Sequence, residues 1–154
     1  MVATYENFGI HLLYPENWTV QDEQIESWPR SVSLQSPQGA YWELQVYPSD
    51  TSPRQLARQA LEAMREIYQD LEAEAVSEDL WHVTARGYDL QFFCLDFLVT
   101  SRIRSFHAGM HTCLLTCQAE SREFDLQQPV FNAITKSLLD AAGLCGLESP
   151  PRDT

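Results

Sequence analysis

One stretch near the middle of the chain constrains the fold most, because it is apolar in both of the directions that a β-strand can face. One set of alternate positions holds Tyr88, Leu90, Phe92, Cys94 and Leu98, and the other holds Phe93, Leu95, Phe97 and Val99. Successive side chains of a strand point to opposite faces, so a sheet with one wet face shows strict alternation. The stretch therefore predicts an inner strand that helices or loops cover on both faces.

Around this stretch the chain offers further strands joined by short turns, which require antiparallel pairing. The predicted strands of the second half are residues 80–85, 88–99, 102–107 and 112–118, with turns at Arg86-Gly87 and Ala108–Met110. We predict an α/β fold of the α+β type. Its roughly six- to seven-stranded antiparallel sheet is covered by helices on both faces, as a three-layer α/β/α sandwich.

Length and charge bound the choice of function. With 154 residues the chain fits one domain, predicted over 1–143, and a flexible C-terminal tail at 144–154. The net charge of −12, from 22 acidic and 10 basic residues, repels phosphate backbones and anionic lipid. We therefore expect no nucleic acid and no membrane insertion, and a basic protein fits better as a partner.

The chain shows no targeting signal. Its first nine residues lack a basic or an apolar region, and no later stretch reaches the ~20 apolar residues of a membrane span. The expected compartment is the cytoplasm. Its reducing conditions would keep the cysteines as thiols, and their spacings include no C-x-x-C pair; they are Cys94, Cys113, Cys117 and Cys145.

Local signals predict the first half of the chain. A strand from Phe8 stops at Pro15, and a polar loop spans 21–30. Alternation over 31–35 and 40–47 around the turn residues 36–39 predicts a hairpin.

Two helices are predicted. Ser52, Pro53 and Gln55 form a capping box with proline at the first helical position, and an apolar stripe continues to Leu71. A last helix is expected to start at Asp125 or Gln128, with Pro129 in its first turn and Gly143 as its C-cap.

Three segments carry a resemblance to a known family. They are Phe8-Gly9-Ile10, Tyr14-Pro-Glu-Asn-Trp18 and the ending Pro129–Ser137. With the order of elements they resemble the PsbP-like superfamily, which includes an extrinsic subunit of photosystem II, Ran-binding Mog proteins and small bacterial proteins. The resemblance spans residues 8–139 and implies an antiparallel sheet between helical layers and a role in binding other proteins. Its residues are structural, and no pattern carries Ran binding over.

A metal site is the first chemical hypothesis, because imidazole and thiolate are the usual zinc ligands. A three-residue turn at 108–110 would place His107 opposite His111, with Cys113 two residues further on, giving at most three ligands. A two-residue turn at Ala108-Gly109 would break that pairing. Cys117 would lie ~13 Å from Cys113 on the same strand, too far for one ion. Packed cysteines and hairpin-end histidines explain the same residues, and we predict no metal or other cofactor.

Acidic side chains form the second candidate surface. Glu62, Glu66 and Asp70 follow one helix face at i, i+4 spacing, continued by Glu72 and Glu74. Like charges at this spacing cost a few tenths of a kcal/mol each, so the stripe is either a docking face for a basic partner or a solvated face.

Two smaller features also suggest binding. Trp28 beside Arg30 in the polar loop has the composition of an interface anchor, although a tryptophan packed under its own loop is the alternative. Arg102 and Arg104 share a strand face, with Arg86 expected nearby, and such a patch could hold a carboxylate or phosphate or balance charge.

Catalysis finds little support. The sequence contains no G-x-S-x-G elbow and no glycine-rich phosphate loop, and Cys94 with His82 is the only pair to consider. Apolar neighbours would keep that thiol protonated and inert. We therefore predict a non-enzymatic interaction or adaptor module. The alternative is a small-ligand or metal-binding protein that uses the His107/His111 region.

Overall fold

The protein folds around a curved antiparallel sheet with one helix on each side. The structure is a computed structural model, and it describes residues 1–23 and 29–140. The sheet has seven strands in the order β3-β4-β5-β9-β8-β7-β6, and all neighbours are antiparallel. The strands are β3 (Thr19–Glu23), β4 (Arg30–Gln35), β5 (Tyr41–Pro48), β6 (Glu72–Leu80), β7 (Val83–Cys94), β8 (Phe97–Ala108) and β9 (His111–Glu120).

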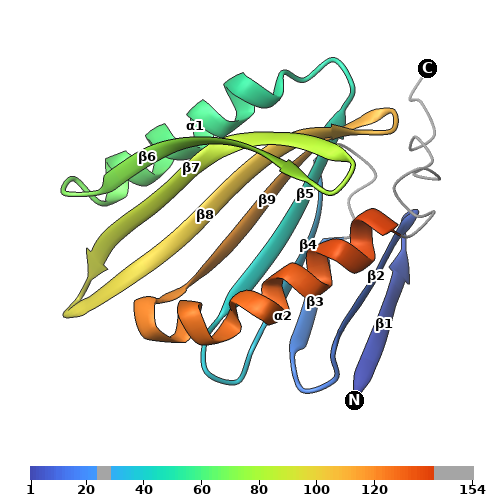
Figure 1. The fold of residues 1–154 in the computed structure, drawn as a ribbon, viewed down its shortest axis with the longest axis horizontal. Helices are drawn as coiled ribbons and strands as arrows, with labels where there is room; N and C mark the ends of the chain where they lie inside the picture. The colour runs from blue at the N-terminus through green and yellow to red at the C-terminus, as the bar shows by residue number, and fades with distance from the viewer. Residues whose placement is uncertain (24–28, 141–154) are drawn as a thin grey trace.

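A separate hairpin precedes this sheet. Strands β1 (Val2–Asn7) and β2 (Ile10–Pro15) pair with each other, and β2 packs against the last helix (Figure 1). The turn between them uses left-handed backbone at Phe8 (φ 54°) and Gly9 (φ 78°). The sequence predicted one strand from Phe8 and missed β1.

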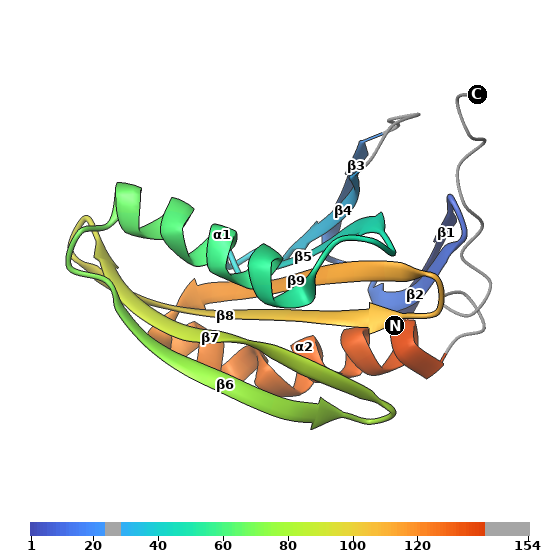
Figure 2. The same cartoon turned by 90° about the horizontal axis from the view of Figure 1, so that it is seen from above.

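The two helices lie on opposite sides of the long strands. Helix α1 (Pro53–Ile67) contacts β7, β8 and β9, and helix α2 (Ser121–Asp140) contacts β2, β8 and β9 (Figure 2). Each helix covers only part of the sheet. An α+β fold with a seven-stranded antiparallel sheet is therefore confirmed, whereas a complete three-layer sandwich is not.

The hydrophobic core consists of two clusters, one on each face of the sheet, because successive side chains of each strand point to opposite faces. Toward α2, the apolar side chains of β4, β5 and β9 pack with Phe131, Ile134 and Leu138. Trp42 is fully buried there, and its indole Nε1 donates to Thr135 Oγ1 of α2 at 3.1 Å. Toward α1, Leu56 and Leu61 pack on a smaller set from β7, β8 and β9: Leu90, Phe92, Ile103 and Leu114.

Elements with strong local signals match the prediction. The β4–β5 hairpin turns at 36–39, where Gly39 has φ +90° and its amide donates to the Ser36 carbonyl oxygen at 3.1 Å. Helix α1 is capped by Ser52, whose hydroxyl accepts from the Gln55 amide at 3.3 Å, and begins at Pro53. These signals lie within a few residues of each other, so they are readable without tertiary contacts.

The central apolar stretch is a hairpin end, not one inner strand. Strand β7 ends at Cys94, β8 starts at Phe97, and Cys94 pairs with Phe97 across a two-residue turn in which Leu95 has φ 56°. Phe93, Leu95 and Phe97 are 66%, 89% and 58% exposed. The prediction was wrong because it equated apolar side chains on both parities with burial, although apolar atoms are common on protein surfaces.

Three other boundaries also differ. Helix α1 ends at Ile67, one turn before the predicted end at Leu71, and residues 72–80 form β6, of which only the end at Leu80 was predicted as strand. The next turn lies at Trp81–His82, and Gly87 is inside β7. A Cβ atom at Gly87 would lie 1.9 Å from the Ile103 carbonyl oxygen, so this glycine serves close strand contact instead of a turn.

Helix α2 starts earlier than predicted. The Glu120 carboxylate accepts from the amides of Arg122 and Glu123 at 3.1 and 3.2 Å, which caps the helix at Ser121. Pro129 therefore lies inside the helix, where its missing N–H leaves the Asp125 carbonyl without its usual helical donor. Gly143 and the predicted tail at 144–154 lie outside the described residues.

Candidate functional site

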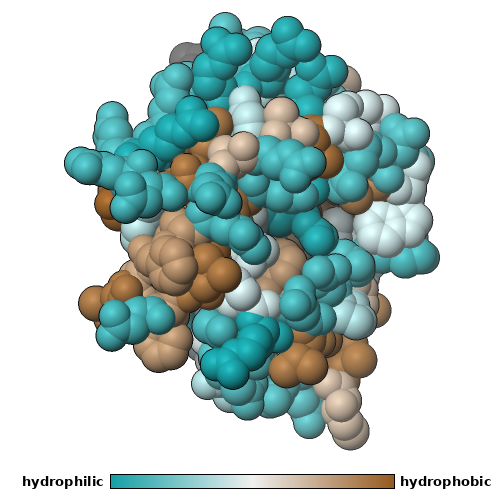
Figure 3. All heavy atoms as spheres, turned by 60° about the vertical axis from the view of Figure 1, so that its left-hand side comes forward, coloured by the Kyte–Doolittle hydropathy of each residue, from teal (hydrophilic) through white to brown (hydrophobic). Residues whose placement is uncertain are grey.

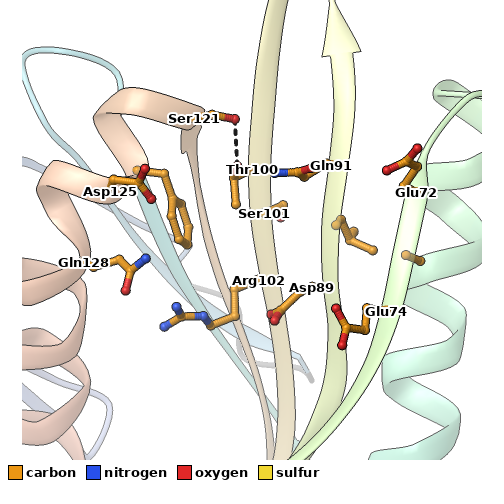
Figure 4. A pocket seen from close by; sticks show the side chains of 13 residues that line it. Glu72, Glu74, Asp89, Gln91, Thr100, Ser101, Arg102, Ser121, Asp125 and Gln128 are labelled. Carbon is orange, nitrogen blue, oxygen red and sulfur yellow. Dashed lines mark hydrogen bonds between the residues drawn. The ribbon is translucent and has the colours of Figure 1, made fainter.

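A groove runs between the first half of α2 and strands β6, β7 and β8. Its volume is about 500 Å³, and its wall on the sheet side carries Glu72, Glu74 and Asp89 (Figure 4). Asp125 and Gln128 form the helix side. At one end Thr100 Oγ1 and Ser121 Oγ share a hydrogen bond of 2.8 Å, which joins β8 to the start of α2.

The strand register explains why these side chains meet. Glu72 pairs with Gln91 and Glu74 with Asp89, and β8 places Arg102 opposite Asp89. Cross-strand partners share a face, so all of them project toward α2. This register could not be predicted from the sequence, because the prediction placed Glu72 and Glu74 beyond the end of a helix.

Two arginines border the groove, and both are already engaged. Arg104 is 3% exposed, and its Nε and Nη2 donate to Glu78 Oε1 and Asp89 Oδ1, each at 2.8 Å. The half-buried Arg102 lies over the Phe124 ring, 5.4 Å from its centroid. Arg86 pairs with Ser105 and so faces the other side of the sheet. Arg102 and Arg104 share a face of β8, as predicted, but Arg86 is not near them and Arg104 is neutralised by its two carboxylates.

The groove is acidic on balance. Four carboxylates and one guanidinium, that of Arg102, line it. Among the described residues, Glu72, Glu74 and Asp125 form no ion pair. The negative charge there is available to a cationic group of a ligand.

An apolar hairpin tip adjoins the groove. We define the tip as Phe93, Leu95 and Phe97, at the β7–β8 turn. Phe93 follows groove residue Gln91 by two positions, so the two side chains share a face of β7. Figure 3, which brings this end forward, shows apolar side chains gathered there beside hydrophilic ones.

The acidic residues predicted as a helix stripe are divided by the fold. Glu62 and Glu66 are exposed on α1, Asp70 is exposed in the turn after it, and Glu72 and Glu74 lie on β6. A continuous helical stripe is therefore not formed. The α1 residues stay a predicted contact surface.

The second predicted contact surface is only partly described. Trp28 lies outside the described residues, whereas Arg30 begins β4 and is 8% exposed. Arg30 Nη1 donates to the Phe8 carbonyl oxygen at 2.9 Å, and its guanidinium lies over the Phe8 ring at 5.3 Å. Arg30 ties the β1–β2 hairpin to the sheet and offers little surface to a partner.

The histidine pairing behind the metal hypothesis is wrong. The turn is the two-residue Gly109–Met110, so Ala108 pairs with His111 and His107 pairs with Thr112. His107 and His111 consequently face opposite sides of the sheet. Within residues 1–23 and 29–140 no group of three or more potential ligands is close enough to hold a metal ion.

The cysteines are positioned as packing residues. Burial raises the pKa of the Cys113 and Cys117 thiols to about 12, which keeps them protonated. Cys94 lies beside the Tyr68 hydroxyl, with 3.9 Å between oxygen and sulfur. His82 and Cys94 lie at opposite ends of β7, so they form no catalytic pair.

Comparisons with known proteins place the fold. No family model and no curated protein matches the chain. The solution structure of cyanobacterial PsbP (CyanoP) from Synechocystis sp. PCC 6803 matches with a TM-score of 0.60 and 13% identity, over 88% of this chain and 90% of that one. PA94, a protein of unknown function from Pseudomonas aeruginosa, matches with a TM-score of 0.54 and 11% identity, over 91% and 97%.

These matches concern architecture alone, because both identities are low. They agree with the resemblance that residues 8–139 show in sequence. In the described part of the chain, no helix is long and apolar enough to cross a membrane. The chain has the PsbP-like fold.

Proposed function

We propose that this chain is a non-enzymatic protein-interaction module, and that it docks a basic partner on the hairpin tip and the acidic groove beside it. The observation that carries the proposal is the exposure of three large apolar side chains, Phe93, Leu95 and Phe97, at one turn. Exposed apolar clusters rimmed by polar residues are typical of contact sites. An aromatic anchor beside a charged rim is the usual anatomy of an interface.

Other exposed apolar side chains extend the same end. Helix α1 ends near the tip, since the Tyr68 ring stacks on Phe92 with centroids 4.1 Å apart, and the neighbouring Ile67 is 69% exposed. A partner could therefore bury apolar surface from several elements while its cations meet Glu72 and Glu74.

Charge favours a basic protein over the other candidates for this surface. A second copy of the chain would bring another charge of −12, and anionic lipid would face the same repulsion. We therefore expect the purified chain to be monomeric and not to bind anionic vesicles. A cytoplasmic location stays a prediction, as does the absence of catalysis.

The test compares bait variants in affinity capture from extract of the native cell, with quantitative mass spectrometry. The tip variant is Phe93→Ser/Leu95→Ser/Phe97→Ser, and the groove variant is Glu72→Lys/Glu74→Lys. Glu62→Lys/Glu66→Lys tests the α1 surface. The matched control is Trp81→Ser/Met110→Ser, which removes exposed apolar side chains at the other end of the sheet.

The proposal predicts that the wild type and the control variant recover the same basic protein in equal amounts. The tip variant and the groove variant should both fail to recover it. Recovery should also fall as salt rises, because charge pairs contribute. Equal recovery by all baits would contradict the proposal. Loss with the α1 variant alone would move the contact to Glu62 and Glu66.

A further inference from the structure

A second pocket, on the opposite face of the sheet from the groove, has the reverse charge. It has a volume of about 530 Å³ and lies between the start of α1 and strands β7 and β8. Four basic side chains line it: Arg54, His82, Arg86 and His107. They come from α1, the β6–β7 turn, β7 and β8.

None of these four side chains forms an ion pair with another described residue. No carboxylate lines the pocket, and the hydroxyl of the lining residue Thr84 donates to the Asp79 carboxylate at 3.1 Å. A chain with 22 acidic residues thus places two arginines and two histidines, none in an ion pair with a described residue, around one concavity. Such a concavity attracts an anion, because its wall focuses the field of like charges.

One of the four side chains is fixed by a buried hydrogen-bond chain. The hydroxyl of the fully buried Thr112 donates to the Thr51 carbonyl oxygen at 2.8 Å and lies 3.1 Å from His107 Nδ1. A hydroxyl has one proton, and here the carbonyl takes it, so His107 Nδ1 must be the donor to Thr112. The ring is thereby oriented, and its Nε2 atom stays available to a ligand.

The helix start adds to this arrangement. Pro53 has no N–H, the Gln55 amide donates to the Ser52 hydroxyl, and the Leu56 amide donates to the Ser52 carbonyl oxygen. These amides are occupied, so the helix start contributes its dipole alone. Ser52, Pro53 and Arg54 all line the pocket, and the positive end of the α1 dipole therefore lies beside it.

We propose that this pocket binds a small organic anion that carries a phosphate or carboxylate group. Arg54 and Arg86 would supply charged donors. His107 would donate from Nε2 when its ring carries a second proton, because a ring whose Nδ1 holds the only proton is an acceptor at Nε2. The volume lies within the ~300–1,000 Å³ that is usual for small-molecule sites. The site is remote from the hairpin tip, because His82 and Cys94 lie at opposite ends of β7. Failure of the anion-binding proposal would therefore leave the docking proposal untouched, and failure of the docking proposal would leave anion binding untouched.

The test is an amide chemical-shift titration of the full chain with inorganic phosphate and, separately, citrate, at constant ionic strength against chloride. Saturable shifts are expected at residues 52–54, 82–86 and 107. A phosphate preference would indicate a phosphate ester as the natural ligand, and a citrate preference a carboxylic acid.

Variants of the lining residues test whether this pocket is the place where the anion binds. Arg86→Gln and Arg54→Gln should each weaken binding about tenfold, or ~1.4 kcal/mol, because each removes a charged donor to the anion. Arg65→Gln, on the exposed last turn of α1, is the matched control and should leave binding unchanged. Circular dichroism checks that each variant is folded, and the exposed Arg54 serves if the half-buried Arg86 does not tolerate change. No saturable shift with either anion, or equal affinity in all variants, would overturn the proposal.

Discussion

The face of the sheet under α2 has two halves that contrast sharply. Around β5 and β9 it is sealed, with Trp42, Leu44 and Phe131 fully buried. On β6, β7 and the near half of β8 it is a charged groove. The change occurs along one strand, because Phe106, Arg104 and Arg102 are successive residues of the same face of β8: the first two are 0% and 3% exposed, and the third is half-buried.

The contrast shows that the position of α2 determines which half becomes core. Where α2 packs closely, side chains toward it are apolar. Where the sheet extends past the helix, they are carboxylates and arginines, and Arg104 with its two carboxylates marks the border. The border has buried apolar core on one side and solvent on the other. A buried guanidinium with two partly exposed carboxylate partners suits such a position. The open half is then available for binding.

The largest effect should follow truncation in the sealed half. Phe131→Ala removes a fully buried ring that contacts Trp18 and Phe124, and we expect it to lower the free energy of unfolding by about 3–5 kcal/mol. Phe93→Ala at the tip should change it by less than ~0.5 kcal/mol. Urea denaturation measures both free energies. Equal losses for the two variants would contradict the assignment of Phe131 to the core and of Phe93 to the open surface.

Gly87→Ala should come next. Its Cβ would meet the Ile103 carbonyl oxygen at 1.9 Å, and two paired backbones cannot separate locally without losing ladder bonds. We expect a loss of about 3 kcal/mol. Gly39→Ala is the control: nothing lies within 4 Å of its Cβ, so only the strain of φ +90° applies, about 1–2 kcal/mol. Thermal and urea unfolding measure both losses. A smaller loss of stability for Gly87→Ala than for Gly39→Ala would contradict the close strand contact at Gly87.

A smaller loss is expected when the border arginine is removed. Arg104→Met eliminates both ion pairs, but the side chains of Glu78 and Asp89 are 38% and 48% exposed and can return to water. We predict about 1–2 kcal/mol in urea unfolding. Arg122→Met, whose side chain is 90% exposed beside Glu120, should be indistinguishable from wild type. A loss above ~4 kcal/mol for Arg104→Met would mean that the border behaves as closed core.

The smallest effect concerns pH. Burial and, second, the charge of Arg30 lower the pKa of His111, so the folded state holds this ring neutral while the unfolded state protonates first as pH falls. Stability from His111 is therefore complete above the unfolded pKa of ~6.5 and decreases below it, by at most ~1.4 kcal/mol per pH unit. His111→Gln should flatten the stability profile between about pH 7 and pH 5. An unchanged slope would contradict this assignment.

The sequence predicted what local chemistry specifies and missed what register specifies. The β4–β5 turn and the start of α1 follow from Gly39 and from Ser52 with Pro53, so both are confirmed. The turn after Cys94 has no glycine, asparagine or proline, and Leu95 itself takes the left-handed backbone. Its one turn-forming residue, Asp96, was a weak signal among apolar neighbours.

The candidate site was predicted less well for the same reason. The acidic charge was evident, but the meeting of Glu74, Asp89 and Arg102 depends on the pairing of three strands. The opposite orientations of His107 and His111 depend on a one-residue difference in turn length. Such differences exchange the two faces of a sheet, and no composition or spacing argument resolves them.

The most direct test of the account is site-specific photo-crosslinking in extract of the native cell. A benzophenone amino acid at position 95, in the exposed tip, should form an adduct with another, basic protein, and Glu72→Lys/Glu74→Lys should abolish that adduct. The same amino acid at position 110, in another exposed turn at the other end of β8, should form none. Equal adducts from both positions, adducts only between copies of this chain, or none at position 95 would contradict the claim that the β7–β8 end is the contact surface.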